Sequence, residues 1–125
     1  MELNDLSYKI RGAIFQVHLE LGPGLFESVY ESALVYELRS LGLSSQTQLA
    51  LPIRYKNTIL ELGFRIDVLV ENEIIIELKS VESLHEIYKK QLLTYLKLSN
   101  RRLGFLVNFN VYKITDKISL IRIIN

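Results

Sequence analysis

The stretch Ile74-Ile75-Ile76-Glu77-Leu78-Lys79 decides the fold of this chain. Apolar and β-branched residues dominate it and a polar triplet at residues 71–73 precedes it as a turn, so the stretch predicts a β-strand. Side chains alternate between the two faces of a strand. The alternation places Glu77 and Lys79 on one face with Ile75, and Ile74, Ile76 and Leu78 on the other.

Two earlier segments extend this strand into a sheet. Residues 49–55 and 58–70 are β-rich with a period of two, and Lys56-Asn57 supplies a turn between them. With the second turn at residues 71–73, the three segments predict an antiparallel meander.

Helical spacing marks the start of the chain. Apolar residues recur three or four positions apart between Leu6 and Leu21, and Gly22-Pro23-Gly24 ends that helix. A second helix is predicted from near Leu25 to Gly42. Its expected apolar face consists of Phe26, Val29, Tyr30, Ala33, Leu34, Leu38 and Leu41.

The last third of the chain completes the fold. Residues 83–98 return to helical spacing, and residues 104–109 and 117–124 predict two closing strands. The resulting order ααβββαββ predicts an α/β (α+β) fold in which helices flank a mixed central β-sheet.

Composition limits the class of protein. The chain has 125 residues, of which 49% are apolar and 23% charged, so we expect a single domain over residues 1–125. The absence of cysteine excludes thiolate nucleophiles and cysteine-ligated metal sites. No apolar run approaches the roughly 18 residues of a transmembrane helix, and no signal peptide follows Met1. We therefore expect a soluble, cytoplasmic protein that does not enter a membrane.

The net charge of +1 hides an uneven distribution. Residues 1–78 carry six Lys/Arg against eleven Asp/Glu, whereas residues 79–125 carry nine against three. The acidic part could supply metal ligands and the basic part could meet an anionic partner such as nucleic acid. Ordinary solvated charge is the alternative.

An acid pair is the first candidate site. Asp67 lies in a strand, where aspartate is disfavoured, and Glu77 follows ten residues later. If residues 71–73 form the hairpin turn, Asp67 lies within a residue or two of the cross-strand neighbour of Glu77. Two adjacent carboxylates repel unless a cation lies between them, and Mg²⁺ or Mn²⁺ suits oxygen ligands.

Three more polar positions stand on apolar faces. Glu27 lies in the first turn of the second helix, where an acid also simply favours the helix dipole. Lys79 follows Glu77 on the same face, although a salt bridge would account for it too. Gln91 interrupts the face of the third helix one turn before Tyr95, either as a buried polar group or at the edge of that face.

These residues resemble a known family. The pattern of Asp67 followed ten residues later by Glu77-Leu78-Lys79 resembles the motif of the PD-(D/E)XK nuclease superfamily. The proline of that motif is absent here. The stretch Gln91-Leu92-Leu93-Thr94-Tyr95 resembles the QxxxY motif of RecB-like members, and Gly24 to Tyr30 is similar to the signature of the small GxxExxY proteins. The resemblance covers nearly the whole chain and implies a restriction-endonuclease-like core.

The resemblance also implies roles. Asp67, Glu77 and the main-chain carbonyl of Leu78 would bind Mg²⁺ or Mn²⁺, and Glu27 would complete the shell directly or through water. Lys79 would orient the attacking water or stabilise the transition state, Gln91 would hold Lys79 or the phosphate, and Tyr95 would contact the substrate backbone. The candidate phosphate contacts are Lys89, Lys90, Lys97, Arg101 and Arg102, which are otherwise a solvated face.

Two functions remain open at this point. The first is a metal-dependent phosphodiesterase that hydrolyses nucleic acid, with DNA preferred over RNA, and we favour it. The second is a catalytically silent nuclease-fold binding module or accessory subunit. A homodimer would suit an enzyme that cuts both strands.

His18 and His85 lack the spacing of a metal site, and we expect both on the surface.

Overall fold

The computed structural model describes the backbone of residues 1–125 and the surroundings of every residue except Leu62 and Gly63. The elements follow the predicted order ααβββαββ. They are α1 (Leu3–Leu21), α2 (Glu27–Ser40), β1 (Ser45–Tyr55), β2 (Thr58–Val70), β3 (Ile74–Lys79), α3 (Glu86–Leu98), β4 (Leu103–Asn108) and β5 (Leu120–Ile124).

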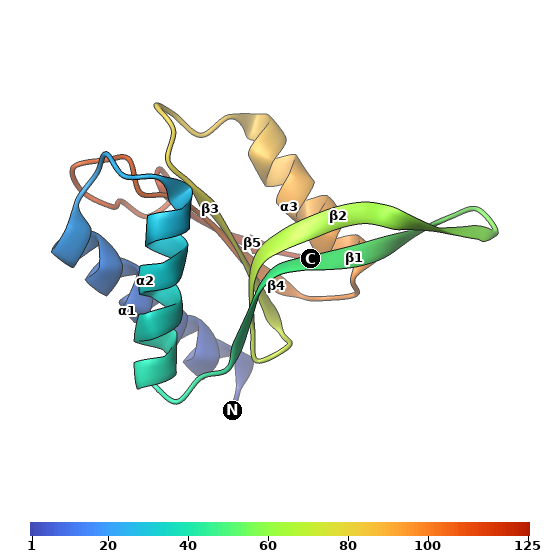
Figure 1. The fold of residues 1–125 in the computed structure, drawn as a ribbon, viewed down its shortest axis with the longest axis horizontal. Coiled ribbons are helices and arrows are strands. Elements are labelled where there is room, and N and C mark those ends of the chain that lie inside the picture. Colours follow the sequence, from blue (N-terminus) through green and yellow to red (C-terminus); the bar gives the residue numbers. More distant parts are fainter.

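The five strands form one mixed sheet in the order β1-β2-β3-β4-β5. β3 and β4 pair in parallel, whereas all other neighbours are antiparallel. A parallel pair requires a crossover connection, and α3 supplies it. Figure 1 shows α1 and α2 on one side of the sheet and α3 on the other. The fold is therefore the predicted α+β arrangement of helices flanking a mixed sheet.

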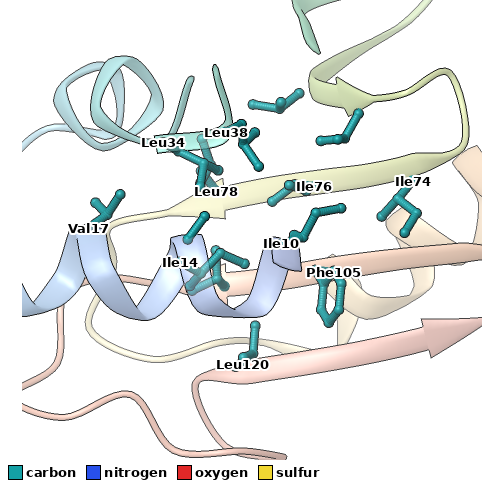
Figure 2. Packing of buried hydrophobic residues seen from close by; sticks show 14 of the residues in the cluster. Ile10, Ile14, Val17, Leu34, Leu38, Ile74, Ile76, Leu78, Phe105 and Leu120 are labelled. Atoms are coloured by element: carbon teal, nitrogen blue, oxygen red, sulfur yellow. The ribbon is translucent and has the colours of Figure 1, made fainter. Parts of the chain in front are cut away.

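Each face of the sheet has its own apolar core, and β3 contributes to both. Ile74, Ile76 and Leu78 pack with α1 and α2, as Figure 2 shows, whereas Ile75 packs toward Leu92 of α3 on the opposite face. The predicted alternation along β3 is confirmed. Because both faces are covered, a charged side chain on β3 is placed in an apolar environment.

The second helix starts later and buries fewer residues than predicted. α2 begins at Glu27, and Phe26 precedes it with an extended backbone at φ −73° and ψ 154°. The side chains of Phe26, Val29 and Leu41 are exposed, so their assignment to the apolar face was wrong. Tyr30, Leu34 and Leu38 form the buried face instead.

Three further boundaries and one histidine also differ. α3 begins at Glu86 after the N-cap His85, β1 begins at Ser45, and β5 is confined to Leu120–Ile124. His18 was expected on the surface but is buried, because its Nε2 lies 2.6 Å from the carbonyl oxygen of Val111. His85 is exposed, as expected.

The β1–β2 hairpin extends beyond the helices as a two-stranded arm (Figure 1). Its turn lies at Lys56-Asn57, as predicted, and Lys56 adopts a φ of 55°. No helix in the part of the chain that the structure describes is long and apolar enough to cross a membrane.

Replacing Gly104 by alanine is expected to lower the free energy of unfolding by about 1–3 kcal/mol, because the new methyl group would overpack the core. A Cβ there would lie 3.0 Å from Leu92 Cδ1 and 3.2 Å from the carbonyl oxygen of Ile75. Urea unfolding measures the effect. Gly12→Ala in α1 is the control, since its Cβ meets no described atom within 4 Å, and a helical alanine should stabilise by up to about 1 kcal/mol. An unchanged Gly104→Ala midpoint would refute the close packing.

Candidate active site

Strands β2 and β3 separate at the two predicted carboxylates. Their backbone pairing ends with Val68 opposite Ile76, one residue before Asp67 and Glu77. The side chains replace the missing ladder bonds. Glu77 Oε2 accepts the backbone N–H of Asp67 at 2.9 Å, and Asp67 Oδ2 accepts that of Leu78 at 2.9 Å. The predicted proximity of the two acids is confirmed.

The acid pair is electrostatically strained. Glu77 is only 6% exposed, and burial, followed by the negative charge of Asp67, raises the pKa of its carboxyl from 4.5 to about 8. The hydrogen bond from the Asp67 backbone and the nearby Lys79 ammonium oppose this rise in pKa without cancelling it. A cation between the carboxylates would relieve their repulsion.

The main-chain carbonyl of Leu78 faces the same opening. The N–H and C=O of one strand residue point to the same side, and the Leu78 N–H points to Asp67. The carbonyl of the next residue, Lys79, points to the opposite side, where it accepts the N–H of Phe109. Leu78 also lines a surface hollow with Glu27, Ser28, Glu31, Gln48 and Asp67.

The donor set fits a hard divalent ion. It consists of oxygen atoms, from the carboxylates of Asp67 and Glu77 and the carbonyl of Leu78. Among the side chains that the structure describes, no three acids or histidines form a group that could hold a metal ion. Glu27 therefore borders the hollow without forming a three-residue site with Asp67 and Glu77. Mg²⁺ retains several waters and needs only one or two protein carboxylates. Two carboxylates are therefore a sufficient protein contribution.

Lys79 lies beside the acids on the predicted face of β3. Its side chain is half-buried, and Nζ stands 4.6 Å from the ring centroid of Tyr88 on α3. Its positive charge acts on Glu77. The aromatic ring thus holds the ammonium near the carboxylates. Among the described side chains Lys79 forms no salt bridge, so the alternative role considered for it is not observed.

Helix α3 also brings Tyr95 to the acids, from the same side of the sheet as Tyr88. The Tyr95 ring stacks on Phe64 with centroids 4.1 Å apart. Burial, and then the charges of Glu77 and Asp67, raise the pKa of its phenol, which remains a hydrogen-bond donor at neutral pH. Gln91 interacts with this phenol and is exposed, so of the two alternatives it lies at the edge of the helix face and is not a buried amide.

The segment between α1 and α2, which the sequence marks as a helix stop and as the start of the GxxExxY-like stretch, is a fixed loop. Gly24 adopts a φ of 94° and its N–H donates to Asn110 Oδ1 at 3.1 Å. Ser80 Oγ donates to the carbonyl of Leu25 at 2.6 Å. These bonds connect the loop to the ends of β3 and β4 and fix the start of α2, where Glu27 lies.

Replacing Tyr30 by phenylalanine is expected to lower the free energy of unfolding by about 1–3 kcal/mol. The Tyr30 hydroxyl donates to the carbonyl of Gly22 at 2.6 Å and accepts the N–H of Leu25 at 3.2 Å, so its loss leaves two backbone groups without this partner. Urea unfolding checks the prediction. Tyr36→Phe is the control, because Tyr36 is exposed. Equal midpoints for the two variants would contradict a structural role of the Tyr30 hydroxyl.

Two polar residues at the site were missed. Gln48 adopts a φ of 50°, which is rare for a residue with a side chain, and its Nε2 lies 2.7 Å from Glu31 Oε1 and 3.4 Å from Asp67 Oδ1. Asn108 is buried, and its Oδ1 and Nδ2 bond the backbone of Val81, which holds the segment that follows Lys79. Neither residue belongs to a sequence motif. A glutamine within a strand and an asparagine at the end of another strand therefore carry no signal that could have identified them.

The five predicted phosphate contacts do not gather at the acids. Arg101 bonds Asn72 in the β2–β3 turn, and Arg102 lines a hollow with the same turn. That turn is at the start of β3, whereas Glu77 is near its end, roughly 10 Å away at 3.3 Å per residue from Ile74. Lys89 and Lys90 lie near the start of α3, where Lys89 pairs with Glu86, and Lys97 is exposed near its end.

Comparison with known proteins decides the family. The model of the PD-(D/E)XK nuclease superfamily matches residues 4–121, which is nearly the whole chain. The chain belongs to the PD-(D/E)XK nuclease superfamily. The flanked mixed sheet is consistent with the restriction-endonuclease-like fold of this superfamily. No curated protein and no solved structure matches the chain significantly.

Membership of the PD-(D/E)XK superfamily indicates nuclease activity and a nucleic-acid substrate. Enzymes of the PD-(D/E)XK type generally use divalent metal ions. The β2–β3 hairpin brings Asp67 and Glu77 together, and Lys79 follows Glu77 on the same face of β3.

Proposed function

We propose that the chain is a Mg²⁺- or Mn²⁺-dependent nuclease that hydrolyses phosphodiester bonds, with DNA as its preferred substrate. The observation that carries this proposal is the carboxylate pair at the point where β2 and β3 separate, with an ammonium beside it. The proposal includes a place among the GxxExxY proteins, a cytoplasmic location and a homodimer for cutting two strands.

In this mechanism Asp67, Glu77 and the Leu78 carbonyl would hold the ion, and Glu27 would complete its shell directly or through water. The bound ion would polarise the scissile phosphate and lower the pKa of the attacking water. The protein contributes fixed ligands, since backbone hydrogen bonds hold both carboxylates in place before any ion binds.

The remaining residues act on the phosphate and the water. Lys79, held against Tyr88, orients the attacking water or stabilises the negative charge that develops on phosphate oxygens. Tyr95 donates its phenolic hydrogen to the substrate backbone, and Gln91, next to it, holds Lys79 or the phosphate. Lys89 and Lys90, near the start of α3, supply phosphate contacts, and Lys97, Arg101 and Arg102 extend them along the basic part of the chain.

The experiment titrates Mn²⁺ and Mg²⁺ calorimetrically into the wild type and into the double variant Asp67→Asn/Glu77→Gln. The same samples are then incubated with supercoiled plasmid and with labelled single strands. We expect metal binding and metal-dependent cleavage in the wild type only. Metal binding without cleavage would favour the second candidate, a silent binding module. No binding at all would reduce the acid pair to a structural network.

A further inference from the structure

Two large aromatic side chains border the loop that precedes the site. Phe26 is 82% exposed and directly precedes Glu27, the acid at the mouth of the hollow. Tyr112 is 96% exposed and lines a second hollow with Pro23, Gly24, Asn110 and Val111. Neither ring fills the core, so neither contributes much to folding.

The backbone on both sides of Phe26 is held in place. The N–H of Leu25 donates to the Tyr30 hydroxyl, and the Leu25 carbonyl accepts Ser80 Oγ. Glu27 opens α2 immediately afterwards. Phe26 therefore projects from a rigid junction between two elements, which reduces the conformational entropy lost when a ligand binds.

The loop that carries Tyr112 is held from α1 and α2. Buried His18 contacts the carbonyl of Val111 at 2.6 Å, and the Phe109 ring stacks on Tyr30 with centroids 4.5 Å apart. Arg11 pairs with Asp116 farther along the same loop. The buried histidine, which no metal role explains, thus fixes the residue next to Tyr112.

Charge alone does not provide strong binding of a nucleic acid at this position. The hollow beside Phe26 is lined by the acids Glu27, Glu31 and Asp67, and the net charge of the chain is only +1. At this position phosphate contacts therefore add little affinity, and uncharged contacts with bases must supply it. Stacking of bases on aromatic rings supplies such affinity without regard to sequence.

We infer that Phe26 and Tyr112 form a stacking platform for unpaired bases and that the substrate of the adjacent site is single-stranded nucleic acid. The inference rests on the proposed nuclease function for the location of the backbone. Bases inside a duplex already stack on their neighbours, so a paired strand offers no free face to either ring. A single strand, an overhang or an unpaired segment does.

The test measures binding separately from cleavage. Fluorescence anisotropy of labelled oligo(dT) and of a duplex of equal length is recorded with the full chain carrying Asp67→Asn, so that no turnover is needed. We expect the single strand to bind more tightly, and Phe26→Ala and Tyr112→Ala each to weaken its binding about tenfold or more. Duplex binding should change little in both variants.

Matched variants identify stacking as the cause. Phe26→Trp should retain binding because it keeps an aromatic face, whereas Phe26→Leu, apolar without such a face, should lose it. Tyr36→Ala on α2 removes another ring, which is 66% exposed, and should have no effect. Thermal unfolding should be unchanged in all variants, since these side chains are exposed.

Three results would overturn the inference. The first is equal affinity for the single strand and the duplex. The second is full single-strand binding by Phe26→Leu, which would indicate an apolar contact with a protein. The third is a loss of single-strand affinity in Tyr36→Ala as large as that in Phe26→Ala. None of these would affect the nuclease proposal, which fails separately if the wild type binds no metal and cleaves nothing. Single-strand binding that depends on Phe26, without turnover, would support the platform on its own.

Discussion

Lys79→Ala is expected to lower the rate of metal-dependent cleavage about a hundred- to a thousandfold while leaving Mn²⁺ binding and the fold intact. Removing one group that stabilises charge in a transition state has an effect of this size. The Lys79 side chain is half-buried and its ammonium contacts the Tyr88 ring, so its removal opens no large cavity. Plasmid nicking rates and calorimetric titration of Mn²⁺ measure the two quantities.

The control for this variant is Lys9→Ala. Both substitutions remove one positive charge, but Lys9 is exposed on α1, which lies on the other side of the sheet from α3 and the contact of Lys79 with Tyr88. We expect Lys9→Ala to change cleavage only slightly, with a modest effect at low salt. Equal rates in Lys79→Ala and the wild type would remove Lys79 from the mechanism, and equal losses in both variants would indicate a general charge effect.

The sequence predicted the acid pair because its elements are local. Asp67 and Glu77 lie on consecutive strands joined by the short turn at residues 71–73, so period-two alternation and the turn together determine which side chains meet. The same reasoning placed Lys79 beside Glu77. The position of a side chain along a hairpin depends on few contacts, so it can be predicted from the sequence.

The surroundings of the pair depend on contacts between distant segments. His18 was expected to face solvent because helical periodicity reports the apolar face only, and its partner Val111 lies 93 residues away. Phe26 was assigned to the helix face because nothing in the sequence marks Glu27 as the first helical residue. Gln48 reaches Glu31 and Asp67 through an unusual backbone angle that no sequence pattern announces.

The basic residues show the same limit. The sequence offered five candidate phosphate contacts, or else a solvated face, and the structure distributes them from the first turns of α3 to the residues beyond its end. Arg101 bonds Asn72 at the start of β3, whereas Lys89 lies on the first turns of α3. Composition gives the number of charged residues but not the surface on which their side chains lie. A basic half of a chain therefore need not form one basic face.

Stability of the metal-free protein is expected to fall as the pH rises from about 4.5 to about 8. Burial and the neighbouring Asp67 raise the pKa of the Glu77 carboxyl from 4.5 to about 8. Between these values the folded protein keeps a proton that the unfolded chain releases, so the free energy of unfolding decreases with pH by on the order of a few kcal/mol and then levels off. Chemical unfolding in EDTA at several pH values measures this slope.

Glu77→Gln separates this effect from the titration of other groups. The amide mimics the protonated carboxyl, since its carbonyl oxygen still accepts the Asp67 N–H, and it does not titrate. We expect the variant to lose most of the slope and to be more stable than the wild type at pH 8 without metal. Parallel curves for both proteins would contradict the raised pKa.

A bound divalent metal should make the wild type more stable than Glu77→Gln, which reverses their order of stability without metal. At pH 8, near its pKa, Glu77 is charged in about half of the folded wild-type molecules, and this charge beside Asp67 costs stability. A divalent ion that binds only the folded state offsets that cost by mass action. Mn²⁺ should therefore raise the unfolding temperature of the wild type more at pH 8 than at pH 6, where a proton competes for the same carboxylate. Glu77→Gln should gain much less at either pH. The proton and the ion are thus alternative ways of stabilising one carboxylate pair.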